Sequence, residues 1–147
     1  MSADPQKLPT TFGFLLLDDF TLISMSSAVE TLRMANRLSG TATYRWSTMS
    51  IDGGTVSASD GVSVNVDCMA GGEDALAGLD AVIVCGGRRV AEHVTDEHVR
   101  WLKRCANERL GLGSTCTGSY ALARAGLLDG YLCSIHWEMI SSLTETF

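Results

Sequence analysis

The sequence predicts a three-layer α/β sandwich, with a mainly parallel sheet between two layers of helices. Two continuous apolar runs have the pattern of strands that are buried on both faces: FGFLLL at residues 12–17 and AVIVC at residues 81–85. Helix-like segments separate the strand-like ones, and strands joined through helices form right-handed crossovers in parallel sheets. The run LGLGSTCTGSYALAR at residues 110–124 adds a sharp strand-to-helix turn at Cys116, of the kind that carries a nucleophile.

The first half of the chain continues with one long helix and a second strand. We expect the helix to begin at about Ser24, where apolar residues recur at helical spacing, and to end before Gly40. Residues 44–51 alternate between apolar and polar side chains, which is typical of a strand. Valines on both sides of Asp60-Gly61 indicate a short hairpin.

The second half repeats the alternation. Thr95 is a good cap for a helix that we expect Gly111 to end. The strand that follows leads into the sharp turn, and a helix over residues 117–125 comes after it. We expect a short strand at residues 131–135 and a further helix from about Trp137.

Composition limits the class of protein. A chain of 147 residues that is 46% hydrophobic fits one globular domain with a sizeable core, here residues 12–147. Its 11 basic and 17 acidic residues give a net charge of −6, which argues against a surface that grips nucleic-acid phosphates. No apolar stretch is long enough for a membrane span. Residues 1–11 lack the apolar region of a signal peptide, so we expect a disordered lead and a cytoplasmic location.

The five cysteines do not form the pattern of a disulfide framework or a metal site. Their number is odd, no C-x-x-C pair occurs, and no histidine lies at ligand spacing. We therefore expect no metal and no cofactor. Cys85 and Cys133 lie in apolar runs, where the default for a cysteine is a small buried side chain.

The carboxyl ends of the strands are the expected binding edge, because ligands of open parallel sheets bind there. The segments that we expect to meet at this edge are Asp18-Asp19, Gly86-Gly87-Arg88 and Cys116-Thr117. This edge is therefore the candidate site.

His136 follows the last expected strand and is a candidate to join that site. A histidine within reach of Cys116 supports thiolate chemistry, and a helix that begins at Thr117 favours the anion. The backbone N–H groups of Thr117 and of Gly87 or Arg88 are candidate donors to an oxyanion or a carboxylate.

Other motifs have simpler interpretations. His93 and His98 flank a helix start, and we expect them to be solvated. The three tryptophans are candidates for an aromatic cage around a quaternary ammonium group, although core packing is the preferred interpretation. The segment GLGSTC begins like a dinucleotide-binding fingerprint, but Cys116 replaces its third glycine and no Gly-Lys-Ser/Thr follows.

Several segments together resemble the ThiJ/PfpI superfamily: AVIVCGG at 81–87, STCTG at 114–118, ARAGLLDG at 123–130 and SIHW at 134–137. The first helix, residues 21–36, resembles the GlxA-type branch of AraC-family transcription regulators. The resemblance covers residues 12–147 and implies a flavodoxin-like, class I glutamine-amidotransferase-like fold. In that branch this domain senses a ligand and dimerises, and a downstream helix-turn-helix domain binds DNA.

The resemblance also implies a ligand and a set of binding residues. The effector would be a small nitrogenous metabolite such as betaine, carnitine or an amino-acid-like compound. The resemblance supports a pocket at Cys116, Gly87 and His136, and the strand-end argument adds Thr117, Arg88 and Asp19 as candidate ligand-binding residues. Because residues 141–147 stop in mid-helix without a cap, we expect the domain to be truncated and the DNA-binding domain to lie beyond this chain.

One position distinguishes sensing from catalysis. Catalytic members of the superfamily carry a carboxylate early in the first helix, and Ser24 occupies that position here. Glu30 lies further along the helix and is expected to face elsewhere. A sensing role is therefore favoured over an enzymatic one, which would use Cys116 and His136. The alternatives are a cysteine-dependent hydrolase, hydratase or glyoxalase, and a thiol redox sensor.

Overall fold

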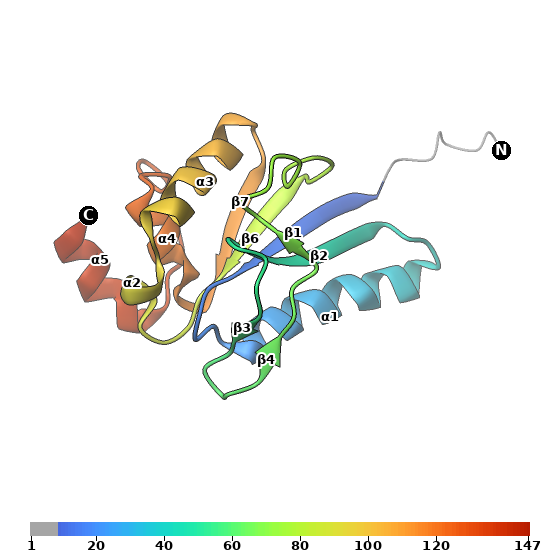
Figure 1. The fold of residues 1–147 in the computed structure, drawn as a ribbon, viewed down its shortest axis with the longest axis horizontal. Coiled ribbons are helices and arrows are strands. Elements are labelled where there is room, and N and C mark those ends of the chain that lie inside the picture. Colours follow the sequence, from blue (N-terminus) through green and yellow to red (C-terminus); the bar gives the residue numbers. More distant parts are fainter. Residues whose placement is uncertain (1–8) are drawn as a thin grey trace.

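The computed structural model describes residues 9–147 and contains a five-stranded parallel sheet (Figure 1). The strand order is β5-β2-β1-β6-β7, and every neighbouring pair is parallel. The strands are β1 (Thr10–Leu16), β2 (Tyr44–Ser50), β5 (Cys68–Met69), β6 (Ala81–Cys85) and β7 (Gly111–Thr115). The parallel sheet predicted from the alternating pattern is therefore confirmed.

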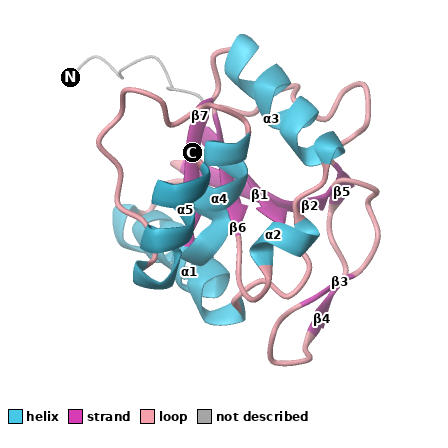
Figure 2. Cartoon of the chain, turned by 90° about the vertical axis from the view of Figure 1, so that its left-hand side faces the viewer, coloured by secondary structure: helices cyan, strands magenta, loops and turns pink. Residues whose placement is uncertain are grey.

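Helices cover both faces of this sheet. Helix α1 (Leu22–Ser39) lies on one face, and α3 (Asp96–Asn107) and α4 (Ser119–Arg124) lie on the other (Figure 1). The short helix α2 (Val90–His93) precedes α3, and α5 (Ile140–Thr146) follows a 3-10 turn near the end of the chain. Strands β3 (Val56–Ser57) and β4 (Ser63–Val64) form the expected hairpin, which protrudes from the domain in Figure 2. Among the described residues, no helix is both long and apolar enough to span a bilayer.

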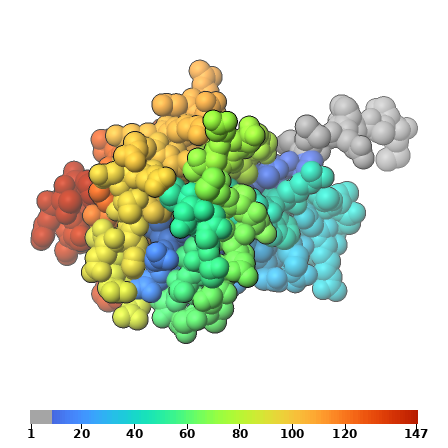
Figure 3. Space-filling view, in the orientation of Figure 1, coloured from blue at the N-terminus to red at the C-terminus, as the bar shows by residue number. Residues whose placement is uncertain are grey.

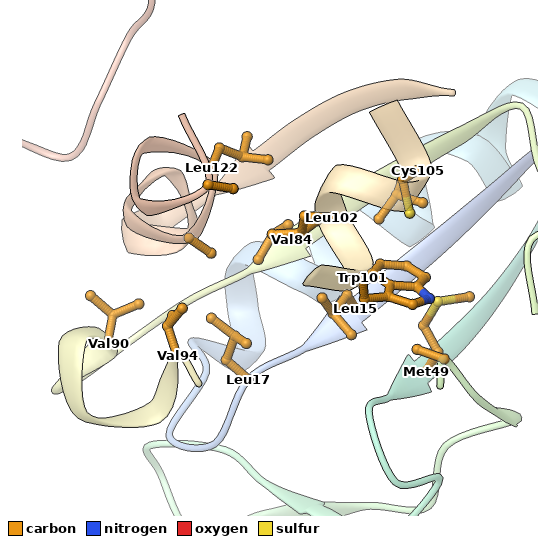
Figure 4. Close-up of a cluster of buried hydrophobic side chains, with 14 residues drawn as sticks. Leu15, Leu17, Met49, Val84, Val90, Val94, Trp101, Leu102, Cys105 and Leu122 are labelled. Carbon is orange, nitrogen blue, oxygen red and sulfur yellow. The ribbon is translucent and has the colours of Figure 1, made fainter. Parts of the chain in front are cut away.

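The core has two parts because β1 and β6 are buried on both faces. Phe14 and Leu16 pack toward α1, whereas Leu15 and Leu17 pack toward α3 and α4. Figure 4 shows the second cluster, in which strand residues meet Leu102 of α3. Burying one such leucine contributes about 1.5–3 kcal/mol. Because successive side chains are buried on opposite faces of the sheet, these strands have continuous apolar sequences.

The tryptophans do not share one site. Trp46 packs with the α1-side cluster, and Trp101 is buried in the cluster on the opposite face. Trp137 is 73% exposed. The aromatic cage considered from the sequence is therefore not formed by these three residues, and core packing is confirmed for Trp101.

Two element boundaries differ from the sequence-based expectation. Thr10 and Thr11 belong to β1, where they pair with Tyr44 and Arg45, so the expected lead of residues 1–11 is too long. Residues 1–8 of that lead lie outside the described part of the chain. Gly111 does not end α3, because it is the first residue of β7. Arg109, with φ of 60°, makes the turn instead.

The strand expected at residues 131–135 is wrong. This segment has no regular structure, and Tyr131 and Leu132 are exposed. Within the described residues, β7 pairs only with β6, so the segment has no strand partner. Cys133 is exposed rather than buried for the same reason, whereas Cys85 is fully buried as expected.

The amino end of α3 is held by a reciprocal capping box. The Thr95 hydroxyl accepts the His98 N–H at 3.4 Å, and the His98 Nδ1 accepts the Thr95 N–H at 3.2 Å. His98 is therefore a structural group, whereas the sequence suggested a solvated side chain. Burial is the main cause that lowers the pKa of His98 below its usual 6.5.

The His98 cap predicts a pH-dependent stability. Because the folded state lowers the His98 pKa, the unfolded chain takes up the proton first as the pH falls. The contribution of His98 to the free energy of unfolding is complete above the ordinary pKa of 6.5. It is lost as the pH falls toward the lower pKa of the folded state. In urea unfolding at about pH 7.5 and about pH 5, His98→Gln should lose less stability than the wild type, since glutamine keeps the capping box. An equal loss in both proteins would contradict this role.

A second prediction concerns the glycines where β6 meets the turn after β7. A Cβ on Gly86 would collide with the backbone of Thr117 and Gly118, which cannot move aside. Gly86→Ala should therefore cost about 1–3 kcal/mol or more in urea unfolding. Gly111→Ala is the matched control, because its Cβ would lie 3.3 Å from the Ala81 Cβ and 3.5 Å from the Asp80 carbonyl oxygen, with no backbone atom at colliding distance. Its effect should stay within about 1 kcal/mol, and equal losses would remove the backbone contact as the explanation.

Candidate functional site

Cys116 occupies the sharp turn between β7 and α4, as the sequence predicts. Its φ is 53°, a left-handed conformation that is unfavourable for a residue with a side chain. The 3-10 turn Cys116–Gly118 continues directly into α4. Gly118 is required for this path, since a Cβ there would strike the carbonyl oxygen of Val84. The strand–turn–helix geometry therefore presents the partly exposed thiol at the carboxyl edge of the sheet.

Hydroxyl groups surround the Cys116 thiol on the side of α1. The Cys116 Sγ lies 3.4 Å from the Thr21 Oγ1. The Ser24 Oγ donates to the Thr21 carbonyl oxygen at 2.8 Å and to the Thr115 Oγ1 at 3.3 Å. Ser24 therefore faces the turn, and a neutral hydroxyl stands where catalytic relatives are expected to carry a carboxylate.

Glu30 does not replace that carboxylate. It forms an ion pair with Arg33 at 2.6 Å on the exposed surface of α1. The expectation that Glu30 faces away from the site is confirmed.

Gly87 and Thr117 meet beside the thiol. The buried Thr117 hydroxyl donates to the Gly87 carbonyl oxygen at 2.6 Å. Gly87 also forms an antiparallel bridge with Phe20, outside the main sheet. Phe20 and Gly87 face each other as a non-hydrogen-bonded pair, in which the N–H and C=O of each residue point away from the other residue. The Gly87 N–H therefore points to the same side as its carbonyl, toward the turn.

Arg88 does not supply the alternative backbone donor. Its N–H donates to the Asp19 carbonyl oxygen at 3.0 Å, so this group is already bound. Of the two donors considered from the sequence, Gly87 is thus the one whose orientation fits the proposed oxyanion or carboxylate pocket.

The Asp19 carboxylate is held by two residues that the sequence analysis missed. Asp19 Oδ2 accepts from Arg89 Nη2 at 2.6 Å and Nε at 3.2 Å, and lies 3.3 Å from His93 Nε2. The hydrogen bond from Arg89 is the main cause that lowers the pKa of Asp19. His93 is therefore a partner of Asp19 and not a solvated side chain. The adjacent Arg88-Arg89 pair was a usable signal, but the pattern does not say which arginine turns toward Asp19.

His136 makes its polar contacts within its own turn. Its Nδ1 accepts the Glu138 N–H at 3.4 Å, and its ring stacks on Trp137 with centroids 6.0 Å apart. Among residues 9–147, no hydrogen bond joins His136 to Cys116. Their pairing stays a prediction.

A cavity of about 250 Å³ lies next to this site, at the carboxyl ends of β1 and β2. Figure 3 shows the hollow between the green segment that follows β2 and the yellow segment around α2 and the start of α3. Asp18, Asp52 and Glu97 are its acidic lining residues. The Gly54 N–H is the main cause that lowers the pKa of Asp52, so its carboxylate stays charged. Cys116 does not line this cavity.

Curated relatives of the chain include transcription regulators. The HTH-type transcriptional regulator GbdR of Pseudomonas aeruginosa is 55% identical over 139 residues, covering 95% of this chain and 37% of GbdR. The HTH-type transcriptional regulator GlxA of Rhizobium meliloti is 37% identical over 137 residues, covering 92% of this chain and 41% of GlxA. The chain therefore spans about two fifths of the length of these relatives.

Solved structures and the family comparison agree with this resemblance. The crystal structure of an AraC family transcriptional regulator from Pseudomonas putida matches with a TM-score of 0.83 and 36% sequence identity. The match covers 93% of this chain and 72% of that one. Residues 13–146 match the DJ-1/PfpI family, so the resemblance inferred from the motifs is confirmed. The chain belongs to the DJ-1/PfpI family.

Proposed function

We propose that this domain is the ligand-sensing and dimerising N-terminal part of a cytoplasmic AraC-family transcription regulator. The observation that carries the proposal is the 55% identity to an HTH-type transcriptional regulator over 95% of the chain. DNA would be bound by a helix-turn-helix domain outside this sequence. The net charge of −6 supports that division, because a DNA-reading surface is basic.

The proposed effector is a small nitrogenous metabolite such as betaine, carnitine or an amino-acid-like compound. Its carboxylate would accept from the N–H groups of Gly87 and Thr117 beside Cys116. Its cationic nitrogen would be attracted by the carboxylates at the strand ends, where Asp18 and Asp52 line the neighbouring cavity. His136 and the Arg88 side chain stay candidates for the rim of this site.

The surroundings of the thiol support sensing rather than catalysis. A nucleophilic cysteine is activated by a base or a positive group that stabilises the thiolate. Here the atom closest to the Cys116 Sγ in the hydrogen-bond network is the Thr21 hydroxyl, at 3.4 Å. Ser24 offers a second hydroxyl at the same end of α1. Such neutral groups suit a binding surface, because they accept or donate without fixing a charge.

Thermal unfolding with a panel of betaine, carnitine and arginine tests the effector site. A ligand at about 100 times its Kd stabilises the folded state by about 2.7 kcal/mol, which raises the Tm by several degrees. Cys116→Ala should reduce the shift because it removes the floor of the site. Cys133→Ala is the matched control, since Cys133 is also a free cysteine but is exposed outside the site.

Three outcomes would contradict the proposal. The first is the absence of a shift with every compound, and the second is an equal loss in both cysteine variants. The third is chemistry at Cys116. Turnover of glyoxal, an isocyanide or a peptide that Cys116→Ser abolishes would favour the enzyme, and peroxide-dependent sulfenic acid would favour the redox sensor.

A further inference from the structure

We infer that Asp19, Arg89 and His93 form a positioning cluster that holds Thr21 against the Cys116 thiol. The cluster lies one step away from the thiol, because the chain leads from Asp19 to Thr21 and the Thr21 hydroxyl lies beside the Cys116 Sγ. Its importance for effector binding rests on the proposed function, whereas its effect on the thiol does not.

The ion pair joins two loops that leave neighbouring strands. Asp19 follows β1, and Arg89 follows β6 and begins α2. Arg89 makes two hydrogen bonds to Asp19 Oδ2, and His93, the last residue of α2, makes a third. The Asp19 side chain is 23% exposed and that of Arg89 is 55% exposed, so the carboxylate is half-buried while the arginine lies at the surface.

Both partners of the ion pair have a left-handed backbone conformation, which surrounding contacts must hold in place. Asp19 has a φ of 58° and Arg89 has a φ of 50°, and neither is a glycine. A left-handed conformation at such a residue persists only where surrounding interactions enforce it. Here each strained residue places its side chain on the other, so the ion pair supplies part of that enforcement.

Backbone hydrogen bonds carry the constraint from the ion pair to the thiol. Next to Asp19, the Thr21 N–H donates to the Gly86 carbonyl oxygen at 3.0 Å. A Cβ on Gly87 would collide with the Asp19 carbonyl oxygen, so the two loops are in direct contact. The path ends at the Thr21 Oγ1, 3.4 Å from the Cys116 Sγ. Loosening the loops should therefore release Thr21 and uncover the thiol.

Alkylation by iodoacetamide, followed for each cysteine by mass spectrometry, tests the inference without a ligand. Arg89→Ala and Thr21→Val should each raise the rate at Cys116 by about threefold or more. If Arg89 acts through Thr21, the double variant should react no faster than the faster single variant, because effects on a shared path do not add. Arg89→Lys should restore part of the protection, since it keeps the charge but not the two-point contact.

Three controls keep the result interpretable. Arg33→Ala breaks an ion pair of the same 2.6 Å length on the exposed face of α1 and should leave Cys116 unchanged. The exposed Cys133 should react equally in all variants. The buried Cys85, whose burial raises its pKa to about 12, reports unfolding if it reacts. Where Arg89→Ala exposes Cys85, the isosteric Asp19→Asn takes its place.

Two results would overturn the inference. One is a Cys116 rate within about twofold of the wild type in Arg89→Ala while Cys85 stays protected. The other is a double variant whose rate is the product of the two single effects, which means independent action. Failure to find an effector in thermal unfolding would contradict only the proposed function, since alkylation needs no effector.

Discussion

The geometry of the strand ends depends on the close approach of backbones at three glycines. A side chain on Gly86 would strike the turn that holds Cys116, and one on Gly118 would strike β6. Gly87 makes the equivalent contact with the loop after β1. Because no Cβ atoms intervene, the ends of β1, β6 and β7 meet through main-chain atoms. The site is thus built on rigid backbone, and the side chains around it are placed by that contact.

The fold was predictable wherever the signal was local. Residues 12–17 and 81–85 are apolar on both faces, and both form central strands with helices on either side. The failures have two causes. Helix α2 and strand β5 contain four and two residues, which is too short for any periodicity. Residues 131–135 have the composition of a strand but no partner within the described chain, and pairing is a tertiary property.

The candidate site, like the fold, was predictable where the signal was local. The small residues around Cys116 indicated the strained turn, and the structure gives it a φ of 53°. Arg89 and His93 were missed because their partner, Asp19, is about 70 residues away and no local pattern records that contact. His98 was misjudged for a different reason: its partner Thr95 is only three residues away, but the capping role depends on which way the His98 ring turns.

The turn at Cys116 is typical of a nucleophile, whereas the groups around its thiol favour a binding site. A cysteine in a strained turn is the usual arrangement for a nucleophile, and the shared fold explains why it is present. However, activation also needs a base or a positive group, and the groups from α1 that reach this turn are the hydroxyls of Thr21 and Ser24. The ion pair between Asp19 and Arg89 is satisfied internally, and Thr21, two residues after Asp19, lies beside the thiol. The rigid thiol, its hydroxyl neighbours and the Gly87 N–H are the groups on which the proposed recognition of a small molecule rests.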